Sequence, residues 1–494
     1  MGAGTALAAL SAAVFVAGLD QTVVVSVLPQ IVTDLRLPIN RFDEAAWLVT
    51  AYLLGFSAAL PLLGRLADVY GYRALFGVCA ALFAGGSLWA AASGGLWGIV
   101  AARALQGAGG GGMIPIALAG TAALYDGRAR IVALGAATGA AEAGAVLGPL
   151  YGAGMLEAFG WRSVFWVNLP LTVALLAAVA TFVRARSVAA GSVDFLGAVL
   201  LGLSLSSLTL GISGSSLGVG GDVRAPLLAA AVLLAAGFLV RQARARWPLL
   251  SLSLFRDTVF ASANAVSFFV GAALIVALVE VPLFATVILD RDTTGGGLML
   301  LRLTAFIPVG ALTGGWLSAR VSRSLVVALG MTASAAGFAR LSLWDTGLTE
   351  PVLTLDLGLT GLGFGLVLAP LAASVLDATK GGAEAIGAAI LTVARTIGML
   401  VGLATLTTWG LTEFNERVAA YRLPLPKEGQ DPAVYDRLLA LYEAHVEDSA
   451  LFVFDRLFLV ACVLCALAAV PALFLRHAGG TEGQARGRKR YSRS

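Results

Sequence analysis

The chain has 494 residues, of which 59% are hydrophobic and 13% are charged, and its mean hydropathy is +0.88. This composition excludes a soluble globular protein, because apolar runs of about twenty residues recur along the chain and each can cross a hydrocarbon core of roughly 30 Å. The net charge of +4 does not indicate nucleic-acid binding, because the basic residues are dispersed through the connections between these runs.

Fourteen apolar spans predict an all-α, polytopic membrane protein. An even number of crossings places both termini on one side. The positive-inside rule predicts that this side is cytoplasmic, since the outer connections hold few basic residues, namely Arg36, Arg41, Arg162, Arg224 and Arg291. The spans cover residues 5–29, 44–63, 74–93, 96–122, 131–156, 163–183, 194–213, 225–240, 258–282, 296–318, 324–343, 352–376, 384–410 and 450–475.

The seventh and eighth spans are predicted to be an insertion, because removing them leaves six spans on each side. Weak internal similarity between the two sets of six indicates parallel lobes with a substrate site between them near mid-membrane. The long outer loop at 411–449 contains two charged, weakly amphipathic segments, 413–421 and 432–447. These segments form either a solvated cap or a contact with a partner or substrate. The expected organisation is an N-terminal six-helix lobe (1–186), two inserted helices (187–250), a C-terminal six-helix lobe (251–478) with a periplasmic loop at 411–449, and a basic cytoplasmic tail (479–494).

The fifth span carries one carboxylate, Glu142, about twelve residues or 18 Å past Arg130 at 1.5 Å per residue. This depth places Glu142 near the bilayer centre. A charge there is costly and is usually functional.

A glycine stripe follows Glu142, with Gly144, Gly148 and Gly152 on one helix face. Such a stripe lets a neighbouring helix approach closely, and ordinary helix packing explains it as well as a specialised role does. Pro149 interrupts the hydrogen-bond ladder and should bend the helix.

Asp20 in the first span and Arg103 in the fourth lie at matching depths, each roughly 8 to 10 Å from the outer surface at 1.5 Å per residue. They can pair if their helices are neighbours. Such a pair either locks two helices together or couples to protons or substrate.

Arg395 lies about as deep in the thirteenth span as Glu142 does in the fifth. A carboxylate in apolar surroundings favours its protonated form once its cationic partner is removed. Making and breaking a Glu142–Arg395 pair would therefore link proton binding to movement of the lobes.

Two further charges, Glu280 and Arg302, are candidates for lining a cavity. Snorkelling towards the interface is the alternative explanation for Arg302 and other charges near helix ends.

The connection after the second span, Gly64-Arg-Leu-Ala-Asp68-Val-Tyr-Gly71-Tyr-Arg73, is predicted to form an inner gate. Asp68 and Arg73 can brace it, and Asp68 can also lie against a helix N-terminus.

Several other sites are excluded by the sequence. It contains no G-x-x-x-x-G-K-[ST] motif, and its G-x-G-x-x-G follows no strand, so nucleotide binding is not predicted. The two histidines are far apart, which disfavours a metal site or a histidine-dependent enzyme.

Together these motifs resemble the fourteen-helix drug:proton antiporter branch of the major facilitator superfamily over essentially the whole chain. Residues 144–153 resemble the antiporter motif G-x-x-x-G-P-x-x-G-G of this superfamily, with Ala153 in place of the last glycine, a mild departure. The matching segments are LDQTVVVSVLP (19–29), GRLADVYGYR (64–73), RALQGAGGGG (103–112), GAVLGPLYGA (144–153) and WRSVFWVNLP (161–170).

Within that branch the chain is most similar to the mycobacterial triacylglyceride exporters. The resemblance implies a lateral opening for lipid, a proton-driven cycle involving Asp20, Glu142 and Arg395, and a periplasmic lipoprotein as partner. Two departures are a short outer connection at 344–351, where those exporters have an extra hairpin, and Arg302 in place of an aromatic residue. The segments that carry this similarity are 39–65, 141–152, 308–316, 393–402 and 409–415.

The sequence therefore predicts a proton-coupled secondary exporter of lipophilic substrates, with lipid favoured over small lipophilic or cationic drugs. We expect a monomer in the inner membrane of a bacterium, with both termini cytoplasmic, that uses the proton gradient and needs no cofactor. A membrane receptor or a lipid-modifying enzyme is a remote alternative. It would need a cluster of polar catalytic groups at one face, which the sequence does not contain.

Overall fold

The structure, a computed structural model, describes residues 2–36, 44–45, 47–182, 192–213, 221–246, 248–249, 251–380, 382–419, 421, 423–425 and 431–475. Fourteen helical segments in this part of the chain are long and apolar enough to cross a membrane, as predicted. The helices are α1 (Ala3–Asp34), α2 (Trp47–Tyr70), α3 (Tyr72–Ala92), α4 (Leu96–Leu124), α5 (Gly127–Phe159), α6 (Arg162–Phe182), α7 (Phe195–Ser213), α8 (Gly221–Arg244), the short 3₁₀ turn η3 (Leu252–Arg256), α9 (Thr258–Val287), α10 (Thr293–Thr304), α11 (Phe306–Ser318), α12 (Arg323–Leu341), α13 (Glu350–Ala378), α14 (Glu384–Ala419) and α15 (Pro432–Ala472).

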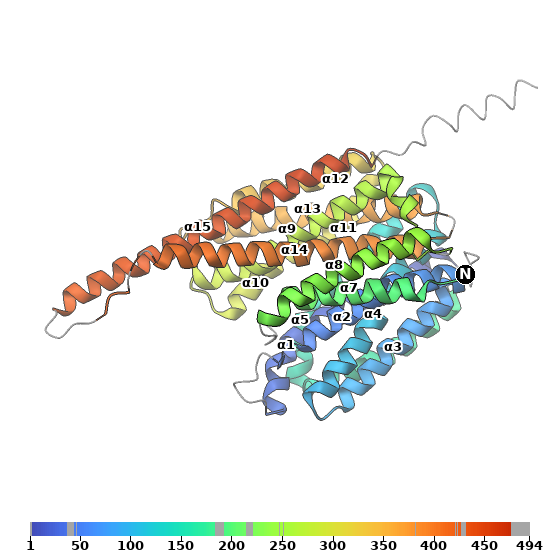
Figure 1. Ribbon diagram of the computed structural model, residues 1–494, viewed down its shortest axis with the longest axis horizontal. Helices are drawn as coiled ribbons and strands as arrows, with labels where there is room; N and C mark the ends of the chain where they lie inside the picture. Colours follow the sequence, from blue (N-terminus) through green and yellow to red (C-terminus); the bar gives the residue numbers. More distant parts are fainter. Residues whose placement is uncertain are drawn as a thin grey trace, which may run out of the picture.

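The helices run roughly parallel to the long axis of the molecule, and α1 begins at the same end at which α15 finishes (Figure 1). We call this end the inner end and the opposite one the outer end. The tenth predicted span is divided into α10 and α11 at Ala305. Pro308 explains the break, because it has no N–H to donate to the carbonyl of Thr304.

Two bundles of six spans form the body of the protein. In the first, α1 packs against α5, α2 and α3 pack against α4, and α3 packs against α6. In the second, α9 packs against α14 and α15, and α13 packs against α11 and α12. The structure does not test the four predicted domain boundaries. Each of them lies at or beside residues that the structure does not describe in full, so the division stays a prediction at 186/187, 250/251, 410/411 and 478/479.

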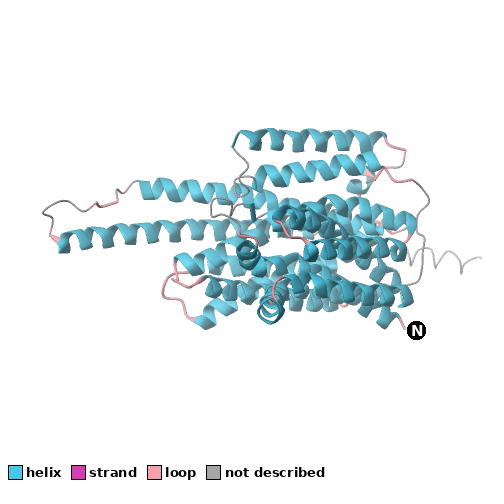
Figure 2. Cartoon of the chain, turned by 90° about the horizontal axis from the view of Figure 1, so that it is seen from below, coloured by secondary structure: helices cyan, strands magenta, loops and turns pink. Residues whose placement is uncertain are grey.

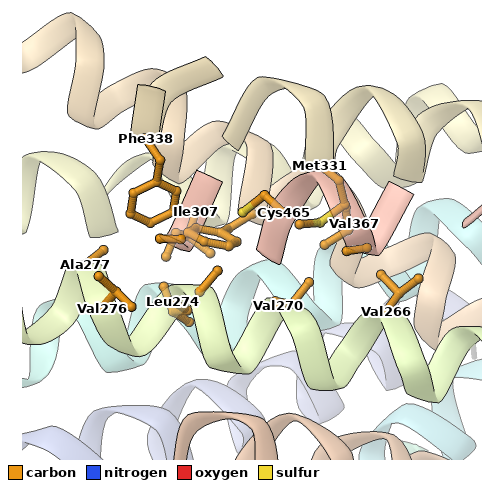
Figure 3. Close-up of a cluster of buried hydrophobic side chains, with 14 of the residues drawn as sticks. Val266, Val270, Leu274, Val276, Ala277, Ile307, Met331, Phe338, Val367 and Cys465 are labelled. Carbon is orange, nitrogen blue, oxygen red and sulfur yellow. The ribbon is translucent and has the colours of Figure 1, made fainter. Parts of the chain in front are cut away.

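Branched and aromatic side chains fill the centre of the second bundle (Figure 3). Val266, Val270 and Leu274 of α9 belong to this cluster, together with Phe338 of α12 and Cys465 of α15. Cys465 is fully buried among these side chains, where its thiol acts as a small apolar group.

The helices α7 and α8, which the sequence predicts to be an insertion, form a hairpin that packs against α2 through α7. Asp194 fixes its inner end. Its carboxylate accepts hydrogen bonds from the Gly197 amide (3.0 Å) and from Gln242 (3.1 Å), and it pairs with Arg241. Ser204 of α7 donates to the carbonyl of Ala231 on α8 at 2.9 Å.

The outer connection 411–449 differs from the predicted loop. α14 continues to Ala419 and α15 begins at Pro432, so the two segments expected inside a loop are the ends of these helices, which protrude beyond the bundle (Figures 1 and 2). The charged residues of these segments do not interrupt a helix, and a Glu413–Arg417 pair supports α14 at the i, i+4 spacing. His445 stacks on Tyr421 with 3.7 Å between ring centroids, which holds the two extensions together.

The glycine stripe of α5 brings this helix against α1. A Cβ added to Gly144 would clash with the backbone oxygen of Phe15, and one on Gly148 would clash with Thr22. Gly152 meets Ser26 and Val23 in the same way. α5 remains one helix through Pro149.

We expect Gly144→Val to lower the free energy of unfolding by about 1–3 kcal/mol or more, because the added carbons have no room between the two backbones. Gly154→Val is the matched control, since a Cβ at Gly154 on the same helix meets nothing within 4 Å. Thermal unfolding of the purified proteins in detergent measures both. Equal melting temperatures for the two variants would contradict the close approach of α1 and α5.

Candidate functional site

The two bundles touch along a seam at the inner end. α5 packs against α11, and α2 packs against α14. A Cβ on Gly135 would lie 3.0 Å from the Ala311 oxygen, and one on Gly64 would lie 3.0 Å from the Ala385 oxygen. These glycines therefore permit backbone contact between the bundles, which closes the inner end.

Hydrogen bonds and ion pairs reinforce this closure. Arg65 donates to the carbonyl of Gly382 at 3.3 Å. Arg130 of the first bundle pairs with Asp377 at 2.8 Å, and Arg323 binds the other oxygen of that carboxylate at 2.7 Å. Asp377 thus ties α5 to α13 across the seam.

Asp68 lies against the N-terminus of α14, which is an arrangement that the sequence allowed for it. Its carboxylate accepts from the backbone amides of Ala385 (2.9 Å) and Ile386 (3.0 Å). The first amides of a helix have no partner within the helix, and the positive end of the helix dipole attracts an anion. A carboxylate from one bundle therefore caps a helix of the other.

The part of Arg73 in bracing the inner gate stays a prediction. Arg73 is exposed and makes no ion pair with Asp68 among the described contacts. Gly71, with φ of 94°, turns the chain between the two residues, and Asp68 is instead directed across the seam.

We expect Asp68→Asn to loosen the inner end, because the amide leaves one oxygen for two backbone donors and removes the charge. The lost bonds correspond to about 1–3 kcal/mol, enough to raise the population of the open inner end about tenfold or more. The measurement is the rate at which maleimide alkylates a cysteine at Ala388, which is buried near this seam. Asp126→Asn is the control, since Asp126 also precedes a helix at the inner end but its side chain accepts no capping bond. An unchanged alkylation rate in Asp68→Asn would contradict the gate.

Glu142 of α5 and Arg395 of α14 form an ion pair between the two bundles, about halfway along the helices. The Arg395 Nη1 donates to Glu142 Oε1 at 3.0 Å, and the side chain of Arg395 is 29% exposed and that of Glu142 is 20% exposed. Glu142 lies midway along α5, about 22 Å from its first residue at 1.5 Å per residue. The expected contact is thus present, and its role in proton coupling remains a prediction.

Asp20 and Arg103 also pair, and they do so inside the first bundle. The Nη1–Oδ2 distance is 2.8 Å, and both side chains are fully buried. Arg103 lies 4.3 Å from the ring centroid of Tyr52, a cation–π contact that helps to hold a buried guanidinium. The pair joins α1 to α4, whereas coupling to protons or substrate stays a prediction for these two residues.

Uncharged side chains complete this network, and the sequence did not single them out. Gln106 and Asn168 each donate to Asp20 Oδ1 at 2.8 Å. Ser87 accepts from Gln106 at 2.8 Å. Their only signal in the sequence is an amide or hydroxyl within an apolar span, which many membrane helices share.

The two cavity candidates have different surroundings. Arg302 lines an open recess of about 630 Å³ together with Glu350 and Thr354. Glu280 is 7% exposed and borders a void of about 10 Å³ between α9 and α14, which is too small for a substrate, and its role in lining a cavity stays a prediction.

The sequence profile described as the Major Facilitator Superfamily matches residues 10–403. A triacylglyceride transporter of Mycolicibacterium smegmatis is 35% identical over 486 residues, covering 95% of this chain and 87% of that protein. A triacylglyceride transporter of Mycobacterium tuberculosis is 34% identical over 494 residues, covering 96% of this chain and 95% of that protein. The fold is similar to that of the proton:xylose symporter XylE, with a TM-score of 0.61, 16% identity, and coverage of 95% and 94% of the two chains.

Proposed function

The chain belongs to the Major Facilitator Superfamily, and we propose that it is a proton-coupled exporter of lipid in the inner membrane of a bacterium. The observation that carries the proposal is the Glu142–Arg395 pair, which joins the two bundles at mid-membrane. The relatives named as triacylglyceride transporters, similar over almost the whole chain, support a neutral lipid as the substrate class. On this proposal both termini face the cytoplasm.

The chemistry of the pair suggests how a proton drives the cycle. With Glu142 ionised, its attraction to Arg395 adds to the contacts that close the inner end. A proton arriving from outside neutralises the carboxylate, and Arg395 then loses its partner across the seam. The bundles can separate at the inner end, where lipid enters laterally, and loss of the proton to the cytoplasm restores the pair.

The Asp20–Arg103 network has a different part in this scheme. All of its members lie within the first bundle, so the network keeps α1, α4 and α6 together while the bundles move against each other. A rigid first bundle places Glu142 reproducibly opposite Arg395, because α5 packs against α1.

The test uses proteoliposomes that carry a fluorescent triacylglyceride in the inner leaflet and an imposed gradient, acidic outside. Arrival of the label in the outer leaflet is read from quenching by an impermeant reductant. We expect the gradient to accelerate quenching and a protonophore to abolish the effect. Equal rates with and without the gradient would contradict proton coupling, and movement of lipophilic cationic dyes alone would favour drug efflux.

A further inference from the structure

A cluster of charges at the outer ends of α10 and α13 has no part in the scheme above. Arg291 and Arg302 both bind the carboxylate of Glu350, one guanidinium on each oxygen. Arg302 also donates to the hydroxyl of Thr354 at 3.2 Å. The two guanidinium groups share this one carboxylate, and Asp290 and Asp292, which flank Arg291 in the sequence, form no described ion pair with either arginine.

The cluster borders an open recess of about 630 Å³. Its lining combines the polar groups of Arg302, Glu350 and Thr354 with the apolar surfaces of Pro351 and Leu355. Leu355 is 72% exposed, so an apolar side chain lies open beside the charges. The lining therefore suits a ligand with an anionic head and an apolar body.

The recess lies at the outer end of a membrane-crossing helix, because Glu350, which lines it, is the first residue of α13. Arg302 follows the first residue of α10 by about nine positions, or 13 Å at 1.5 Å per residue, and its side chain reaches Glu350, the first residue of α13. An arginine at this depth is costly unless it has an anionic partner. Glu350 supplies one such charge for two arginines, which leaves room for a second anion.

The recess lies beside α10, and α10 continues directly into α11, a helix of the seam. α11 packs against α5 of the first bundle, whereas α10, its outward continuation, packs against α9 and α13 of its own bundle. A lipid bound beside α10 would therefore lie outward of the point at which the two bundles meet.

We propose that this recess binds the phosphate of an anionic phospholipid from the outer leaflet. The planar guanidinium of Arg302 matches a phosphate in shape and charge, and it shares its one contacting carboxylate with Arg291. Thr354 can donate a further hydrogen bond, and Pro351 and Leu355 contact the start of an acyl chain. Free phosphate shares the head chemistry but has nothing to place against the apolar lining.

Native mass spectrometry of the full chain in detergent tests this site without requiring transport. Phosphatidylglycerol is compared with phosphatidylcholine of the same acyl chains, and inorganic phosphate serves as competitor. We expect phosphatidylglycerol to be retained about tenfold better, Arg302→Gln to remove most of that preference, and Glu350→Gln to strengthen it because both arginines become free. Arg162→Gln, at an exposed outer arginine of the other bundle that pairs with Asp34, should leave retention unchanged.

The two variants are expected to change the retention of phosphatidylglycerol in opposite directions, which distinguishes a role in lipid binding from a purely structural role. If the cluster only holds α10 against α13, Arg302→Gln and Glu350→Gln both weaken retention and lower the melting temperature, and the proposal fails. Equal retention of the two lipids, or displacement of phosphatidylglycerol by inorganic phosphate at similar concentration, also overturns it. Because the readout is binding, a failure of gradient-driven export leaves this result unaffected.

Discussion

Glu142→Gln is expected to lower gradient-driven export at least tenfold while the protein remains folded. The amide keeps the size of the side chain, but it has no charge to attract Arg395 and cannot take up or release a proton. On the proposed cycle the variant therefore cannot couple export to the gradient. The measurement is the rate of quenching of labelled triacylglyceride in proteoliposomes, with and without the gradient.

Glu157→Gln is the matched control for this experiment. It makes the same substitution on the same helix at an exposed position, so it should retain the gradient dependence of the wild type. Arg395→Gln should share the defect of Glu142→Gln, since it removes the other half of the pair. A Glu142→Gln variant whose export still follows the gradient would exclude this carboxylate from coupling.

Arg103→Ala is expected to destabilise the first bundle by about 3–5 kcal/mol, the cost of leaving a buried charge without its partner. Asp20 would remain fully buried with only Gln106 and Asn168 as hydrogen-bond donors from side chains. The loss of the guanidinium also removes a bond to the carbonyl of Asp20. Thermal unfolding of the purified protein and the yield of folded protein both report the effect.

A double variant distinguishes the ion pair from simple loss of volume. Asp20→Asn with Arg103→Gln removes both charges and keeps polar groups that can bond to each other. It should therefore be more stable than Arg103→Gln alone. If the single and double variants unfold at the same temperature, the charge on Asp20 is not what makes the loss of Arg103 costly.

Depth along a span is the information that made the charged pairs predictable. Asp20 and Arg103 lie at one depth, and so do Glu142 and Arg395, and in each case the structure places the two residues in contact. Each residue is a charge inside an apolar run, where few alternatives to a partner exist. The spans themselves follow from hydropathy, because every crossing helix must be long and apolar.

Contacts near the ends of helices were not predictable in the same way. Arg130 and Asp377 close the inner end, but each lies where snorkelling to water is an adequate explanation, so depth gives no reason to pair them. Which of several charges Asp68 meets depends on how the bundles dock. The sequence indicated that Asp68 could lie against a helix N-terminus, but it did not indicate that this helix would be α14 of the other bundle.

From the sequence, the outer ends of α14 and α15 are also predicted to lie inside a loop. Charged residues in 413–419 and 432–447 look like loop by hydropathy, although nothing in either segment interrupts a helix. The division of one span into α10 and α11 required Pro308 to be read as a breaker at that position. Hydropathy locates membrane crossings better than it locates the ends of helices.

The most direct test of the central claim is the distance between the bundles at the inner end, measured by electron–electron double resonance. Spin labels replace Arg73 and Val321, two exposed inner positions, in a background that lacks Cys79, Cys462 and Cys465. We predict that acidification lengthens this distance in the wild type, because a protonated Glu142 releases Arg395, and that Glu142→Gln shows the longer distance at every pH. A wild-type distance that does not respond to pH, or a Glu142→Gln variant that stays closed at its inner end, would contradict the account.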